Sequence, residues 1–233
     1  MKIRDFEDLI RTQINDVVLQ IIADNKCLPI SAQSRAGAEI SDGIEKYFVE
    51  ATRNHPYLKN SESAPKGKTK NPWDARTFFT YSNYQEEIWI DFKAFKLSSE
   101  DSNPDIGTPD KVIKFIQNGG FYLLYVYVYY EEHGNGLRFI KNTNNEFIKS
   151  YFLKDISPTF RRTPTNQLQV NISAEPIYRT RDEFIELLME KCREGLERQK
   201  DKAETKLQSI DDIKSRLKKC NSDLEQVIEQ TLR

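Results

Sequence analysis

Residues 87–95 and 121–130 are two apolar, strand-like runs separated by a helical pattern, and this unit constrains the fold more than any other feature of the chain. Thr108 resembles a helix N-cap followed by Pro109, and Gly119-Gly120 is a typical helix end. A strand–helix–strand unit within one sheet makes a right-handed crossover, so the two strands are predicted to be parallel. The sequence therefore predicts an α/β fold with a mixed central β-sheet flanked by helices.

The remaining segments predict a core domain of residues 1–180. Residues 3–23 and 35–51 carry apolar side chains at helical spacing, and residues 77–81 are expected to pair with 87–95 as a hairpin. Further strands are predicted at residues 137–141, 147–155 and 167–173.

Residues 181–233 form a separate, charge-rich C-terminal helical region. Ser209 and Asp212 match an N-cap pattern, so a helical hairpin and one long coiled-coil helix are both open. We expect this region to serve packing or dimerisation, with direct DNA contact as the alternative. Its apolar positions recur at alternating steps of three and four, at Ile210, Ile213, Leu217, Cys220, Leu224 and Val227.

The strand at 87–95 carries charged groups that a buried strand does not need. Alternation places Asp91 and Lys93 on one face and Phe92 on the other, and hairpin pairing would bring Asp74 close to Asp91. The acid-x-Lys spacing is common by itself, so an edge-strand ion pair and a coincidental match are the alternative interpretations. Only the pair at Asp91 has apolar neighbours; the same spacing recurs at 24–26, 204–206 and 212–214.

Two carboxylates beside an ammonium group suit hydrolysis of a phosphodiester with Mg²⁺. Asp74 and Asp91 would bind the metal, with the Phe92 carbonyl as a further ligand, and Lys93 would hold or help deprotonate the attacking water. An acid of the 35–51 helix could complete the catalytic set. Glu45 is the first choice and Glu39 the second, and the alternative is an exposed acidic stripe that also includes Asp42.

Three parts of the chain are candidates for contact with DNA. Lys66, Lys68 and Lys70 precede Asp74 and could bind phosphates, although a solvated lysine loop has the same composition. Residues 161–171 are rich in Arg, Asn and Gln, which read base edges, and the alternative is an ordinary polar loop. The DNA-binding candidates there are Arg161, Arg162, Asn166, Gln167, Gln169 and Asn171, with Arg76 and Asn103 as further candidates.

The composition limits the other classes of function. The net charge of −1 means that any affinity for nucleic acid must come from local clusters. The apolar run 121–130 is too short to span a membrane, and charges interrupt the first residues, so no membrane segment or signal peptide is expected. Three cysteines without Cys-x-x-Cys spacing and only two histidines favour a cytoplasmic protein without a zinc site or His-based catalysis.

The residues Asp74, Asp91 and Lys93 resemble the motif of type II restriction endonucleases of the PD-(D/E)xK superfamily, although Trp73 separates Pro72 from the acid. Glu45 resembles the first-helix acid of many members. The Ile-Asp-x-Lys strand is most similar to the EcoRV-type subgroup, whose members tend to leave blunt ends. The resemblance implies a PD-(D/E)xK core with a C-terminal helical appendage.

A closer resemblance is to the SwaI-type endonucleases, which cut rarely. It implies a Mg²⁺-dependent homodimer, cytoplasmic and bacterial, that cuts double-stranded DNA within a long A·T-rich palindrome similar to ATTTAAAT and leaves blunt ends. The stretches that carry the resemblance are 65–76, 87–96, 101–108 and 178–185.

Two other functions remain open at the level of sequence. A structure-specific repair or junction-resolving nuclease could use the same motif, but it would need little base readout, and the composition of residues 161–171 argues against it. A DNA-binding scaffold with a decayed site would bind without cutting. Incubation with A·T-rich plasmid DNA and Mg²⁺ distinguishes the three.

Overall fold

The computed structural model describes residues 1–28, 30, 36–65, 73–99 and 102–232, and it confirms the predicted mixed sheet. The strands lie in the order β1-β6-β5-β4-β3-β2, and β7 pairs with β5. Their bounds are β1 Cys27–Leu28, β2 Leu58–Ser63, β3 Ala75–Tyr81, β4 Tyr84–Lys96, β5 Tyr122–His133, β6 Gly136–Ile140 and β7 Ile148–Phe152.

The crossover from β4 to β5 has the predicted form. Helix α3 (Pro109–Gln117) connects the two strands, which pair in parallel with Asp91 opposite Tyr125, whereas the other strand pairs are antiparallel. Thr108 is the N-cap residue and Gly119 has a φ of 88°, a backbone conformation that favours glycine after a helix. The Trp89 ring stacks on Phe115 of α3, with 3.8 Å between ring centroids, and this contact joins the helix to the sheet.

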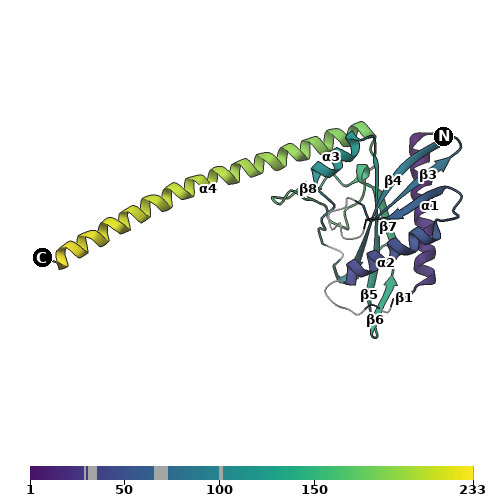
Figure 1. Cartoon of the computed structure of the whole chain (residues 1–233), viewed down its shortest axis with the longest axis horizontal. Coiled ribbons are helices and arrows are strands. Elements are labelled where there is room, and N and C mark those ends of the chain that lie inside the picture. The colour runs from purple at the N-terminus through teal and green to yellow at the C-terminus, as the bar shows by residue number, and fades with distance from the viewer. Residues whose placement is uncertain (29, 31–35, 66–72, 100–101, 233) are drawn as a thin grey trace.

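Helices α1 (Ile3–Asp24) and α2 (Ala36–Ala51) lie on one side of the sheet (Figure 1). Their apolar faces include Ile14, Val18 and Phe48, and the Phe48 ring lies 5.7 Å from that of Phe92 in β4. Because side chains alternate along a strand, Ile88, Ile90 and Phe92 face these helices. This leaves the odd-numbered residues of β4 for the opposite face.

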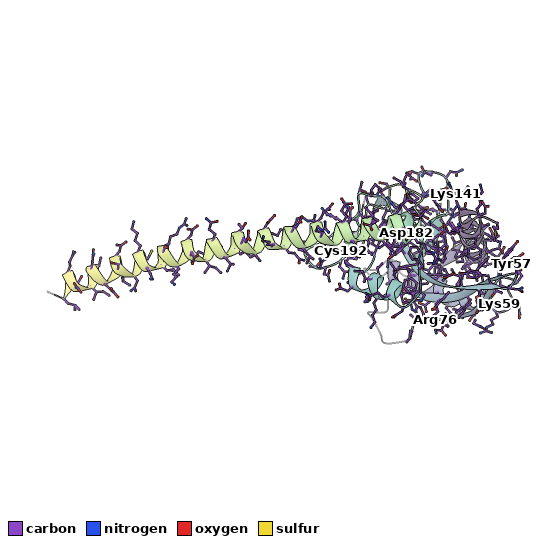
Figure 2. All side chains as sticks on the ribbon, turned by 90° about the horizontal axis from the view of Figure 1, so that it is seen from above. Tyr57, Lys59, Arg76, Lys141, Asp182 and Cys192 are labelled. Atoms are coloured by element: carbon purple, nitrogen blue, oxygen red, sulfur yellow. The ribbon has the colours of Figure 1, made fainter. Side chains whose placement is uncertain are left out.

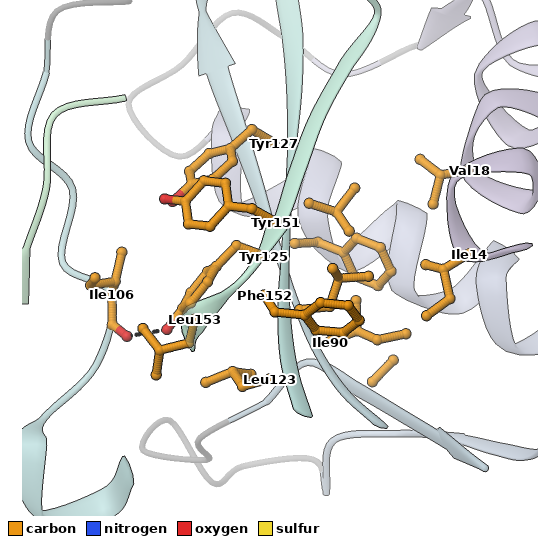
Figure 3. Packing of buried hydrophobic residues seen from close by; sticks show 14 of the residues in the cluster. Ile14, Val18, Ile90, Ile106, Leu123, Tyr125, Tyr127, Tyr151, Phe152 and Leu153 are labelled. Atoms are coloured by element: carbon orange, nitrogen blue, oxygen red, sulfur yellow. Dashed lines mark hydrogen bonds between the residues drawn. The ribbon is translucent and has the colours of Figure 1, made fainter. Parts of the chain in front are cut away.

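Buried tyrosines occupy that opposite face. Tyr125, Tyr127 and Tyr129 of β5 are at most 1% exposed. The hydroxyls of Tyr125 and Tyr127 have partners inside the protein (Figure 3). The Tyr125 hydroxyl donates to the Ile106 carbonyl, and the hydroxyls of Tyr127 and Tyr151 lie 2.8 Å apart. The buried tyrosines thus form a packed layer next to Asp91 and Lys93.

The strand predicted at residues 167–173 is largely wrong. Only Leu168–Gln169 (β9) is a strand, and it pairs with Arg161–Arg162 (β8) in a separate two-stranded sheet. Asn171 ends it, because its Oδ1 accepts hydrogen bonds from the backbone N–H (2.9 Å) and hydroxyl (2.5 Å) of Ser173 and so stabilises a turn. The strand predicted at 147–155 is divided into β7 and a 3₁₀ turn, η2 (Leu153–Asp155); a second 3₁₀ turn, η1 (Leu97–Ser99), follows β4.

The C-terminal region is one helix, α4 (Arg181–Thr231), so the helical-hairpin alternative is wrong. Ser209 lies inside this helix, and its hydroxyl donates to the Lys206 carbonyl at 2.8 Å instead of capping a new helix. The first turns of α4 pack on the core, and the rest extends away from it (Figure 1). In the described part of the chain, no helix has the length and apolarity needed to cross a membrane.

Candidate metal centre and nucleic-acid interface

The pairing of β3 with β4 brings the two predicted acids together. Ala75 pairs with Ile90, so the same register places Asp74 opposite Asp91. The Asp74 backbone N–H donates to the Ile90 carbonyl at 2.9 Å, and its carboxylate Oδ2 accepts from the Phe92 N–H at 2.8 Å. Asp74 is therefore held against β4 by both its main chain and its side chain.

Lys93 lies on the predicted face of β4. Its Nζ is 2.6 Å from Asp91 Oδ1, and the side chains are 28% and 14% exposed respectively. Phe92 lies on the other face, only 1% exposed. Because β4 lies between β3 and β5, the alternative of an ion pair on an edge strand is wrong.

Charge and burial perturb this group of side chains strongly. Burial, followed by the negative charge of Asp91, raises the pKa of Asp74 to about 7, against the opposing effect of Lys93. Burial also raises the pKa of Asp91. The pKa of Lys93 is lowered by burial but raised more strongly by Asp91, Asp74 and Asp105, so its net shift is upward and it stays an ammonium group.

Of the two acids predicted on α2, the structure brings Glu45 toward the centre. Burial raises the pKa of Glu45, hydrogen bonds from Ser63 and the Ala64 backbone oppose this, and the Glu45 charge in turn raises the pKa of Asp74. Glu39 is exposed, because it lies six positions before Glu45 and therefore about 120° away from it around the helix. Asp42 is also exposed.

The donor set fits a Mg²⁺ ion. Among the described residues, no group of three or more His, Cys, Asp or Glu side chains could hold a metal. Mg²⁺ does not need such a group, since it keeps several waters and uses one or two carboxylates. Asp74 and Asp91 would supply those oxygens at a place where the two acids repel each other, and a cation would relieve this repulsion. The Phe92 carbonyl stays a predicted ligand.

Asp105 is an acid near the centre that the sequence did not indicate. Its charge raises the pKa of Lys93, and its Oδ1 accepts a hydrogen bond from Gln169 Nε2 at 2.7 Å. Leu168 reinforces this contact, since its carbonyl accepts from the Ile106 N–H at 2.9 Å and its N–H donates to Gly107 at 2.7 Å. No local signal could have shown this, because the hydrogen bond joins residues 64 positions apart.

The lysines predicted to bind phosphate, Lys66, Lys68 and Lys70, lie outside the described residues. Arg76 lies in β3, where it forms ion pairs with Glu62 and, at 3.3 Å, with Glu87. Its guanidinium carbon also lies 5.5 Å from the centroid of the Trp73 ring. Arg76 is thus partly engaged within the protein, with its side chain 37% exposed.

In the segment 161–171, several predicted DNA-reading side chains hold the segment together. Asn166 has a φ of 62°, accepts from Arg162 Nε at 2.7 Å and donates to Asp110 at 3.0 Å. Gln169 and Asn171 are bound to Asp105 and Ser173 as described above. Arg161 is exposed, as is Asn103 in the neighbouring segment, and Gln167 is half-buried. Arg161, Asn103 and Gln167 therefore remain the candidates for base contact from this region.

Comparison with known proteins gives one family. The family model described as SwaI-like: SwaI restriction endonuclease matches residues 2–210 of this chain. No curated protein matches the chain.

Proposed function

The chain belongs to the SwaI-like restriction endonuclease family, and on that basis we propose that it hydrolyses phosphodiesters of double-stranded DNA as a Mg²⁺-dependent type II enzyme. The observation that carries this proposal is the meeting of Asp74, Asp91 and Lys93 inside the sheet, with 2.6 Å between Lys93 Nζ and Asp91 Oδ1. The fold does not itself require two acids and an ammonium group on this partly buried face of the sheet.

Each group has a role in the proposed reaction. Asp74 and Asp91 would hold Mg²⁺, which when bound supplies Lewis-acid stabilisation of the charge on the scissile phosphate. Lys93, as an ammonium group, donates hydrogen bonds to a phosphate oxygen and orients the attacking water beside Asp91. Glu45 adds negative charge on the α2 side of the centre. The Phe92 N–H bond to Asp74 fixes that carboxylate in place before DNA arrives.

We further propose that the target is a long A·T-rich palindrome, similar to ATTTAAAT, cut to blunt ends by a homodimer. The resemblance of residues 65–76 and 87–96 to SwaI-type enzymes supports this substrate. A palindrome reads the same on both strands, so two copies related by a two-fold axis would each cut one strand.

The proposal is tested by incubating the protein with A·T-rich plasmid DNA and Mg²⁺ and sequencing the fragment ends. Discrete blunt ends within one repeated sequence are expected. Cutting confined to branched DNA would instead make the protein a repair or junction-resolving nuclease. Binding without any cutting would make it a scaffold.

Asp91→Ala should abolish cleavage, because it removes a metal ligand and the partner of Lys93. Binding of the target DNA in Ca²⁺ should remain close to that of the parent, since the DNA-contact candidates are elsewhere. Asp16→Ala, at an exposed acid of α1, is the matched control and should cut normally. Cleavage by Asp91→Ala at the parental rate would reject the metal assignment.

Gln167→Ala tests base readout by segment 161–171. A side chain that reads one base contributes about 1–3 kcal/mol of discrimination, so binding should weaken at particular base pairs of the target. Asn166→Ala is the comparison, and because Asn166 is held by Arg162 and Asp110, its loss should act through the turn and weaken all sequences alike. Competition binding with single-base-pair variants measures both. An equal loss over all sequences for Gln167→Ala would make Gln167 a backbone contact.

A further inference from the structure

The outer part of α4 carries a row of apolar side chains in water. From residue 201 onward every described residue of α4 is exposed, and Leu217, for example, is 64% exposed. This part of the helix extends from the core as an isolated rod (Figure 2). Large apolar side chains that remain in contact with water along one row indicate a surface that binds another protein surface.

The row has the spacing of a coiled coil. We define the seam as Ile210, Ile213, Leu217, Cys220, Leu224 and Val227. Steps of three and four assign heptad position a to Ile210, Leu217 and Leu224 and position d to the other three. Except for its first residue, the seam lies beyond residues 2–210, the region that the SwaI-like family model matches.

We propose that the seam packs on the seam of a second copy of this chain, in antiparallel orientation and centred between Leu217 and Cys220. Antiparallel helices pair position a with position d, so Leu217 meets the partner's Cys220. Ile213 then meets the partner's Leu224, and Ile210 meets the partner's Val227. Every seam residue gains an apolar partner, and each large side chain faces one of equal or smaller size.

The residues that flank the seam select this orientation. In the antiparallel pair, Arg216 faces the partner's Asp223, and the same ion pair forms twice by symmetry. Exposed Leu207 also meets the partner's Ile228, which removes two further apolar side chains from water. In a parallel pair, Arg216 would face Asn221 and Asp223 would face Ile228, so neither ion pair would form.

The seam contact differs from the contact between two cores that would cut the two strands of one duplex. The last contact of α4 with the core is Gln199, which donates to the Pro164 carbonyl at 3.3 Å. At about 1.5 Å per residue, the two attachment points are about 60 Å apart, whereas the two cleaved strands lie in one duplex with a major groove about 12 Å wide. Seam pairing therefore joins two cores that do not act on the same duplex site. This comparison with cleavage is the part of the proposal that rests on the proposed nuclease function.

The first test is a charge exchange in the full chain, measured by sedimentation velocity without DNA or Mg²⁺. Arg216→Glu and Asp223→Lys should each weaken association about tenfold, because two attractions become two repulsions, and the double variant should restore it. Lys219→Glu and Glu225→Lys change the same charges away from the seam and should leave association unchanged. Failure of the double variant to restore association would overturn the proposal, as would single variants that behave like the parent.

The second test separates the orientations through the cysteine of the seam. In a Cys27→Ser background, oxidation followed by peptide mapping should show no Cys220–Cys220 disulfide, because a parallel pair alone places these thiols together. Adding Leu217→Cys should produce a covalent dimer linked between residues 217 and 220. A Cys220–Cys220 link in the background protein would overturn the antiparallel assignment. Neither result depends on whether the protein cuts DNA.

Discussion

At the scale of single residues, the candidate centre combines groups that resist being charged together. Asp74 and Asp91 lie side by side with their pKa values raised, first by burial, and Lys93 opposes the shift of both. Folding therefore places this site in a state that favours binding of a cation. The metal-free protein should show the cost of this arrangement as a dependence of stability on pH.

Asp74→Asn should stabilise the metal-free protein at high pH. Folding favours the protonated acid, so the stability from this group is complete below its unfolded pKa of about 3.9 and is lost as the pH rises through about 7. The variant keeps an acceptor for the Phe92 N–H and removes the charge, so at pH 8 it should gain about 1–3 kcal/mol. Urea unfolding in EDTA at several pH values should show this gain shrinking toward pH 4. A gain independent of pH would contradict the assignment.

The residues of the centre differed in how far the sequence could predict them. Alternation along one strand was enough to place Asp91 and Lys93 on one face, and hairpin pairing placed Asp74 close to them. Asp105 could not be predicted, since its place depends on a contact with Gln169, far away in the chain. Asn166 was interpreted as a base reader from its residue type alone, but it is bound within its own turn.

At the scale of elements, the β8–β9 hairpin is held on α4 by close packing at Gly195. Arg162 crosses this glycine and its guanidinium donates to the Cys192 carbonyl at 3.4 Å. A Cβ on Gly195 would lie 2.7 Å from Arg162 Cδ and 3.0 Å from its Cβ. The glycine therefore fixes the position of the hairpin that carries Arg161 and Gln167.

Gly195→Ala should destabilise the protein by about 1 kcal/mol, because the clash with Arg162 outweighs the higher helix propensity of alanine. Gly43→Ala in α2 is the matched control. It has open space around its added Cβ and should stabilise by up to about 1 kcal/mol. Thermal unfolding measures both changes, and hydrogen exchange should show loss of protection at residues 161–169 in Gly195→Ala alone. Stabilisation by both substitutions would show that the hairpin is not fixed there.

The helices of the core and the central strands were predicted from the sequence better than the strand at 167–173 and the C-terminal helical region. The helix predicted at 3–23 is α1 and the one at 35–51 is α2, because one strongly apolar face sets each of them. Residues 167–173 failed because side-chain hydrogen bonds of Asn171 stop the strand. The helical-hairpin alternative at Ser209 was wrong because serine is also tolerated inside a helix. Its hydroxyl donates to the Lys206 carbonyl, and α4 continues past it.

At the scale of the whole molecule, one buried lysine joins parts of the chain that are distant in sequence. Lys154 in η2 is 1% exposed, and its Nζ lies 2.9 Å from Glu7 of α1, 2.7 Å from Asp155 and 2.7 Å from the Arg179 carbonyl. Glu7 also accepts from the Tyr122 hydroxyl of β5 at 3.0 Å. The first helix, the central strand and the segment leading into α4 thus share one ionic contact.

Lys154→Met should destabilise the protein by about 3–5 kcal/mol, because it leaves the buried Glu7 carboxylate without its cation. Adding Glu7→Gln should recover part of this loss, since the uncompensated charge is then gone. Lys96→Met breaks an exposed pair with Glu132 and should cost no more than about 1 kcal/mol. Urea unfolding compares the three variants. A loss no larger for Lys154→Met than for Lys96→Met would show that the buried contact is not a shared anchor.

The parallel pairing of β4 with β5 also sets an order during synthesis on the ribosome. Asp74, Asp91 and Lys93 leave the exit tunnel before residues 122–130, which form the ladder along the second edge of β4. Until β5 pairs with it, β4 is an edge strand without the tyrosine layer beside it. Such edge strands are prone to pairing with other chains. A nascent chain that ends in α3 thus contains Asp74, Asp91 and Lys93 of the candidate metal centre but lacks the strand that pairs along them.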